Sequence, residues 1–68
     1  MSQLVQSVTG LLQGTQSMTE AVQVLTTNFP QLSAKEAENT VKDVVDYANK
    51  EMQESELEYW LKNRGLSA

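Results

Sequence analysis

Three Ser-x-x-Glu sequences stand along the chain, at Ser17/Glu20, Ser33/Glu36 and Ser55/Glu58. In such a capping box the Ser hydroxyl accepts a hydrogen bond from the third backbone N–H of a helix. The Glu carboxylate in turn accepts one from the N–H of the Ser. Each box precedes a segment in which apolar residues recur at helical spacing. The boxes therefore predict three helix starts and an all-α fold class.

A further helix is predicted ahead of the first box, over residues 3–13. Its apolar stripe consists of Leu4, Val5, Val8, Leu11 and Leu12. Gly10 weakens a helix by ~1 kcal/mol relative to Ala, so this helix is expected to need a packing partner. Because the segment carries no charged residue, we expect it to be the element buried between the subunits of a homodimer.

The second and third helices are predicted over residues 18–28 and 34–52. Pro30 ends the second helix, because the residue before a proline is pushed out of the α region. The apolar stripe of the third helix extends to Met52. Leu32 and Ala37 stand at the two positions of a hydrophobic staple around the Ser33 box.

The phase of the apolar stripe decides whether the third helix continues to the C-terminus. At ~100° per residue, continuation directs Tyr59 inward and Leu57 and Leu61 outward. A break at Ser55 gives Leu57, Trp60 and Leu61 a common inward face, which buries more apolar surface. We therefore predict a separate fourth helix over residues 56–64, with Trp60 in the core and Tyr59 exposed.

Gly65 follows this fourth helix and is expected to be its left-handed C′ residue. Leu66 would then contact Leu61, as in a Schellman motif. The whole chain, residues 1–68, is expected to be one small bundle of four short helices. A domain of this length buries only ~60% of its unfolded surface, so dimerisation is expected to complete the core.

The composition excludes most catalytic and metal chemistry. Cys and His are both absent, which removes disulfides, thiolate and imidazole chemistry, and Cys/His zinc sites. Asp43 and Asp46 lie off the apolar stripe, on a face expected to be solvated. The acidic series Glu51, Glu54, Glu56 and Glu58 lacks the ligand pattern of an EF-hand. We expect a protein that is not an enzyme and needs no cofactor.

The distribution of charge limits the classes of partner that the chain can bind. The net charge is −4, and Glu20 is the single charged side chain of residues 1–34. An acidic chain is a poor ligand for nucleic acid or for an anionic membrane. No apolar run approaches the ~20 residues of a membrane span, and the N-terminus lacks the features of a signal peptide. A cytoplasmic protein without membrane or direct nucleic-acid contacts is expected.

Candidate partner-binding residues are the apolar side chains that fall off the helical stripes, together with part of the first helix. Exposed aromatic residues are favoured anchors at protein interfaces, although scattered surface apolar residues are also normal. The candidates are Tyr59, Tyr47 and Val24, with Leu4, Val8 and Leu11 for self-association.

Two resemblances concern the middle of the chain. From Thr19 it reads TEAVQVLTTNFPQLSAKEAENTVKDVVDYANKEM, which is similar to the helical hairpin that opens HU/IHF-type DNA-architectural proteins. The resemblance implies the dimerising part of that family, whose β-sheet and basic arms are absent here. Phe29-Pro30 and Trp60-Leu61 also stand where CUE-type ubiquitin-binding domains carry Met-Phe-Pro and a di-leucine.

Small size, the lack of reactive residues and the off-stripe aromatics together predict a function. We expect a protein–protein interaction module that self-associates and acts as a regulator, adaptor, inhibitor or assembly factor. Two alternatives stay open: a nucleic-acid-associated helical protein of HU/IHF type, and an acidic inhibitor that imitates DNA.

Overall fold

The computed structural model describes residues 2–67. These residues contain no strand and form four helices: α1 (Gln3–Leu12), α2 (Met18–Asn28), α3 (Ala34–Ala48) and α4 (Glu54–Asn63). The all-α fold class and the separate fourth helix are confirmed. The bounds of α2 agree with the prediction, whereas α3 ends earlier and α4 begins earlier than the sequence indicated. Within the described residues, no helix has the length and apolar character needed to cross a membrane.

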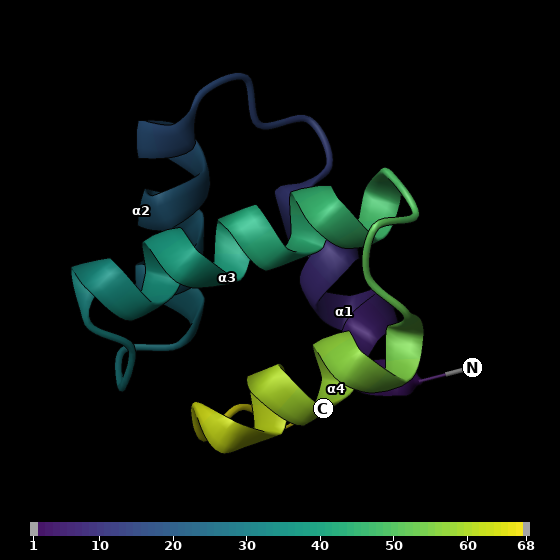
Figure 1. The fold of residues 1–68 in the computed structure, drawn as a ribbon. Helices are drawn as coiled ribbons and strands as arrows, with labels where there is room; N and C mark the ends of the chain where they lie inside the picture. The colour runs from purple at the N-terminus through teal and green to yellow at the C-terminus, as the bar shows by residue number, and fades with distance from the viewer. Residues whose placement is uncertain (1, 68) are drawn as a thin grey trace.

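The helices form a closed ring. Each helix packs against the next one in the chain, and α4 packs against α1. In Figure 1, α3 runs across the middle of the molecule, with α2 at one of its ends and α4 beneath it. The Cα radius of gyration is 10.6 Å, which matches the ~11 Å of a folded chain of this length. The described residues are therefore as compact as a folded chain of this length.

The core consists of apolar side chains from all four helices, from the segment that connects α2 to α3, and from the segment that follows α4. Its buried members are Leu4, Val5, Val8, Ala21, Leu25, Leu32, Ala37, Val41, Val44, Leu57, Leu61 and Leu66. Leu57 and Leu61 of α4 are completely buried, because they stand four residues apart and so share one helix face. That face turns α4 onto α1 and α3.

The Ser33 capping box is complete, and the Ser17 box is half formed. Ser33 Oγ accepts from the N–H of Glu36 at 3.1 Å, and the carboxylate of Glu36 accepts from the N–H of Ser33 at 2.9 Å. Ser17 Oγ likewise accepts from the N–H of Glu20 at 3.1 Å. The carboxylate of Glu20, however, accepts from the N–H of Gln16 at 2.8 Å. Both boxes still mark helix starts.

The third box prediction is wrong, because Ser55 lies inside α4 and caps nothing. The N-cap residue of α4 is Gln53, whose side chain makes no capping bond. Two glutamates of α4 instead contact Ser2. The carboxylate of Glu54 accepts from the N–H of Ser2 at 2.7 Å, and that of Glu58 accepts from Ser2 Oγ at 2.8 Å.

The same Ser2 is the N-cap of α1, a role that no Ser-x-x-Glu sequence marks. Its Oγ accepts from the N–H of Val5 at 3.1 Å. The two glutamates of α4 therefore lie beside the N-terminus of α1, where the helix dipole favours negative charge. These contacts tie the first turns of α4 to the N-terminus of α1, and they do not cap α4 itself.

The prediction that the third helix reaches Met52 is wrong, because the chain leaves α3 at Ala48. Lys50 adopts a left-handed backbone with φ 63°. Its N–H donates to the carbonyl of Tyr47 at 3.1 Å, and the N–H of Glu51 donates to that of Asp46 at 2.8 Å. These two bonds form a Schellman motif, in which glycine is the usual left-handed residue. Lysine at this position gave no sequence signal.

The C-terminal end of α4 agrees with the prediction. Gly65 has φ +85° and donates from its N–H to the carbonyl of Lys62 at 3.0 Å. The N–H of Leu66 donates to the carbonyl of Leu61 at 3.1 Å. Leu66 is buried in the same apolar cluster as Leu61. The Schellman motif thus returns the chain to the core directly after the last helix.

Candidate functional site

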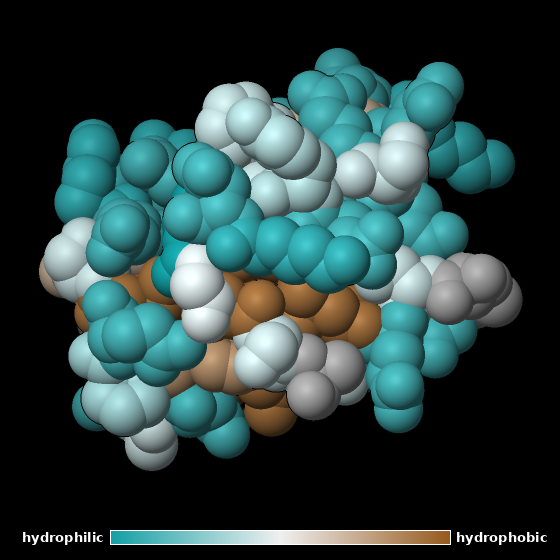
Figure 2. Space-filling view, turned by 90° about the horizontal axis from the view of Figure 1, so that it is seen from below, coloured by the Kyte–Doolittle hydropathy of each residue, from teal (hydrophilic) through white to brown (hydrophobic). Residues whose placement is uncertain are grey.

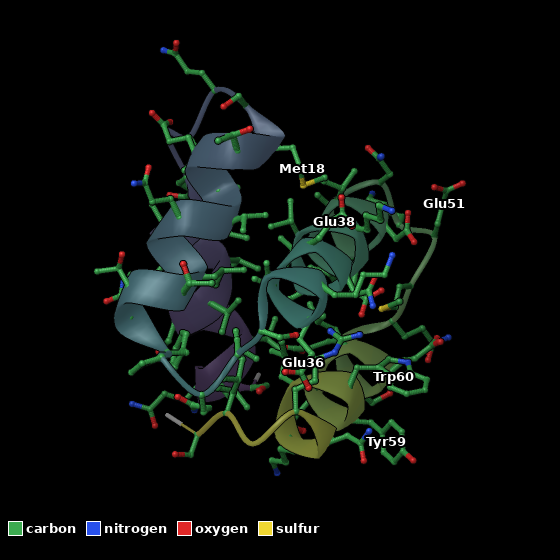
Figure 3. All side chains as sticks on the ribbon, turned by 90° about the vertical axis from the view of Figure 1, so that its left-hand side faces the viewer. Met18, Glu36, Glu38, Glu51, Tyr59 and Trp60 are labelled. Carbon is green, nitrogen blue, oxygen red and sulfur yellow. The ribbon has the colours of Figure 1, made fainter. Side chains whose placement is uncertain are left out.

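Two aromatic side chains project together from the outer side of α4. Tyr59 is 61% exposed and Trp60 is 37% exposed, and Figure 3 shows both pointing away from the helix on the same side. Their ring centroids lie 5.1 Å apart with an interplanar angle of 78°. This edge-to-face arrangement is favourable for aromatic pairs, so the two rings support one another on the surface.

The exposure of Tyr59 agrees with the prediction, but the placement of Trp60 in the core is wrong. The inward direction of α4 is fixed by Leu57 and Leu61. At ~100° per residue, Tyr59 points almost opposite to that direction, and Trp60 falls at its edge. A bulky indole at the edge of a helix face can reach the surface, and here it does.

Arg64 lies next to Trp60 and connects the end of α4 to α3. Its Nη1 donates to Thr40 Oγ1 at 3.0 Å, and its Nη2 lies 2.8 Å from Asp43 Oδ2. The latter contact is an ion pair by distance without the direction of a good hydrogen bond. Thr40 is fully buried and donates in turn to the carbonyl of Glu36 at 2.8 Å.

The guanidinium of Arg64 also covers one face of the indole. Its central carbon lies over the Trp60 ring, 6.0 Å from the centroid, at the outer limit of a cation–π contact. The aromatic pair therefore stands on one helix, with an anchored side chain over the Trp60 ring. Sequence reasoning missed this arrangement, because a dipole-compatible Arg after a helix gives no indication of a partner on another helix.

Glu56 and Asn63 complete the exposed face of α4. Glu56 precedes Tyr59 by three residues and Trp60 by four, and Asn63 follows them by four and three. Residues at these spacings lie next to one another on a helix surface, and all four side chains are exposed. We name Glu56, Tyr59, Trp60 and Asn63 the aromatic patch.

A second apolar feature is an open groove at the junction of α1, α2 and α3. Its volume is about 490 Å³, and Tyr47 contributes to its wall together with Val45, which is 50% exposed. No charged residue is among the lining side chains: Thr9, Leu12, Gln13, Thr15, Ala21, Val41, Val44, Val45, Tyr47 and Ala48. Tyr47 is half-buried and therefore belongs to this groove.

The remaining candidate residues for partner binding differ in their burial. Leu4 and Val8 are buried in the core of the single chain, so α1 does not offer them to a partner. Leu11 and Val24 are half-buried. Apolar atoms also form a band across the face seen from below, bordered by polar side chains (Figure 2). The molecule thus has several apolar surfaces, of which the aromatic patch carries the two largest exposed rings.

Several of the charged side chains form ion pairs. Asp43, expected on a solvated face, is instead half-buried and paired with Arg64. Lys35 lies 3.7 Å from Glu38, and Lys62 lies 3.7 Å from Glu58. Among residues 2–67, no group of acidic side chains is placed to hold a metal ion.

The fold and this surface define the chain as a small four-helix protein with an exposed aromatic patch. Comparisons with protein-family models, with curated proteins and with solved structures each find no match.

Proposed function

We propose that this protein is a non-enzymatic binding module that contacts another protein through the aromatic patch and acts as a regulator, adaptor, inhibitor or assembly factor. The observation that carries the proposal is the exposed pair Tyr59 and Trp60 on one helix. Burying such a side chain contributes roughly 1.5–3 kcal/mol. Tyr, Trp and Arg are also the residues most enriched at the energetic centres of interfaces.

The support of the patch favours this role. The two rings contact one another edge to face on a helix, and Arg64, anchored on α3 by two contacts, lies over the indole. Binding therefore orders few additional side chains, and the entropy cost of association is low. A flexible aromatic loop would lose more of its contact energy in this way.

The experiment compares Tyr59→Ala with Met18→Ala in affinity capture from cells that contain the natural partners. Met18 is a matched control because it is 40% exposed and lies on α2. Far-UV circular dichroism confirms that both variants fold. A partner held by the wild type and by Met18→Ala, but lost by Tyr59→Ala, is expected. A partner retained equally by both variants would refute the proposal.

Self-association is a second candidate function, and the uncharged groove favours it. Val45 stands half-exposed at the groove of α1, α2 and α3, where a second copy could bury it. Leu4 and Val8 take no part, because the core contains them. In sedimentation velocity, a dimer that dissociates with Val45→Lys but not with Tyr59→Ala is expected. A monomer at millimolar concentration would exclude this role.

Nucleic-acid association has less support. Lys35, Lys62 and Arg64 each lie in an ion pair with a carboxylate. Such pairing reduces the positive field that phosphate contacts require. Salt-dependent binding of duplex DNA at nanomolar concentration, measured by fluorescence anisotropy, would reverse this preference.

A further inference from the structure

We propose that the segment which binds the aromatic patch is cationic, with a Lys or Arg side chain stacked on the rings of Tyr59 and Trp60 beside the carboxylate of Glu56. This inference rests on the proposed function and specifies the chemistry of the partner. It is carried by the charge of α4, the position of Glu56, and the contact that Arg64 already makes with the indole.

The charge of α4 is negative on balance. The helix carries three glutamates and one lysine, a net charge of −2. Arg64, which follows the helix, is paired with Asp43 and offsets little of this charge. Lys62 is paired with Glu58, and Glu54 accepts from Ser2 on the side of α1. Of the three glutamates of α4, Glu56 is therefore the one whose carboxylate lies on the exposed face.

Glu56 is placed where a cation on the rings would need an anion. It stands one helical turn before both aromatics, at i−3 from Tyr59 and i−4 from Trp60. The two rings, inclined at 78°, form two sides of a corner rather than one flat wall. Ring faces attract a cation through their quadrupole, and a neighbouring carboxylate adds Coulomb attraction.

One cation already lies near the indole within the molecule, at the outer limit of a cation–π contact. Arg64 lies over the Trp60 ring at 6.0 Å from its centroid. That contact uses one side of the indole, and the more exposed Tyr59 ring lies beside it. A partner's Lys or Arg would repeat the same interaction from the solvent side.

The wider field favours the same partner. Figure 3 shows Glu51 projecting on the same side of the molecule as the two aromatics, and the net charge of the chain is −4. A negative field raises the association rate of a basic segment. A second copy of this chain is disfavoured at the patch, because a two-fold contact would bring the two Glu56 carboxylates together.

The test uses intrinsic fluorescence, because Trp60 is the chain's single tryptophan and lies in the patch. The folded full chain is titrated with a helical peptide that carries several Lys and Arg residues. Two matched peptides replace these residues with Gln or with Glu. We expect saturable binding of the basic peptide, at least ~10-fold weaker binding of the Gln peptide, and none of the Glu peptide.

Variants then locate the cation. Glu56→Gln and Tyr59→Ala are each expected to weaken binding of the basic peptide by about 2- to 5-fold. Glu38→Gln removes the same charge from α3 and is expected to leave the affinity within about 2-fold. Equal losses for Glu56→Gln and Glu38→Gln would mean non-specific charge attraction and would overturn the inference.

Other outcomes separate the inference from the proposed function. The inference of a cationic partner is overturned if the basic and Gln peptides bind equally, or if the basic peptide shows no saturable binding. It is also overturned if the fluorescence of Trp60 changes with the protein concentration and not with the peptide concentration. The proposed function stands if Tyr59→Ala still loses a natural partner whose contacting segment is neutral. If Tyr59→Ala keeps every partner, both fail.

Discussion

Arg64→Ala is the substitution expected to destabilise the fold most for a residue outside the apolar core. It removes a donor to Thr40 and the ion-pair partner of Asp43. A hydrogen bond from a charged group contributes about 1.5–3 kcal/mol, and breaking a fully buried ion pair costs about 3–5 kcal/mol. The side chains of Arg64 and Asp43 are 13% and 19% exposed, so water replaces part of the loss.

We therefore expect the free energy of unfolding to fall by about 2–3 kcal/mol, a value between the losses typical of an exposed and of a fully buried ion pair. A domain of this size has a total stability of roughly 3–10 kcal/mol, so the change is a large share of it. The melting temperature should fall by about 10–20 °C. Arg64→Lys keeps the charge but not the two-pronged geometry and should lose about 1 kcal/mol.

Urea denaturation, followed by far-UV circular dichroism and by the fluorescence of Trp60, measures this change. The emission of folded Arg64→Ala should move to longer wavelength, because the guanidinium no longer covers the indole. A double-mutant cycle with Asp43→Asn should give a coupling energy of about 1–2 kcal/mol. A loss below about 0.5 kcal/mol in Arg64→Ala would refute the reasoning and would assign the docking of α4 to its leucines alone.

Three further predictions concern the helix ends and use the same urea denaturation. Ser33→Ala should cost about 1 kcal/mol because Ser33 caps α3, whereas Ser55→Ala should change the stability by less than about 0.5 kcal/mol because Ser55 caps nothing. Lys50→Gly should stabilise the protein by about 0.5–1 kcal/mol, since glycine relieves the left-handed backbone. Gly65→Ala should cost about 1–2 kcal/mol through its backbone alone, because a Cβ at Gly65 would meet no atom within 4 Å. A loss of stability in Lys50→Gly, or a gain in Gly65→Ala, would contradict these assignments.

The helices themselves were predictable because their apolar stripes follow one period. α2 was predicted to the residue, since Ser17 marks its start and Pro30 its end. Each signal depends only on neighbouring residues, so no knowledge of the packed fold was needed. The staple residues Leu32 and Ala37 are both buried in the core, as their positions around Ser33 predicted.

The errors arose where a distant contact or an unfavourable conformation decides. The first turns of α4 contact Ser2 through Glu54 and Glu58, and Ser2 lies more than fifty residues from Glu54 along the chain. Lys50 ends α3 in a conformation that is strained for a residue with a Cβ. No local pattern encodes either event, and Ser55 supplied a misleading signal nearby.

The candidate site was predictable in part for a similar reason. The exposure of Tyr59 follows from the helical period once Leu57 and Leu61 are known to face inward. The position of Trp60, at the edge of that face, depends on Arg64, and the anchors of Arg64 are Thr40 and Asp43 on another helix. Periodicity gives the direction of a side chain and not the neighbour that covers it.

The most direct test of the central claim maps the binding surface by NMR. A ¹H–¹⁵N correlation spectrum of the labelled chain is recorded while the basic peptide is added. If the aromatic patch binds a cationic segment, the shift changes will concentrate on residues 56–63, with the indole N–H of Trp60 among them. Changes that centre on Val45 and Tyr47 at the groove, or no changes at all, would contradict the account.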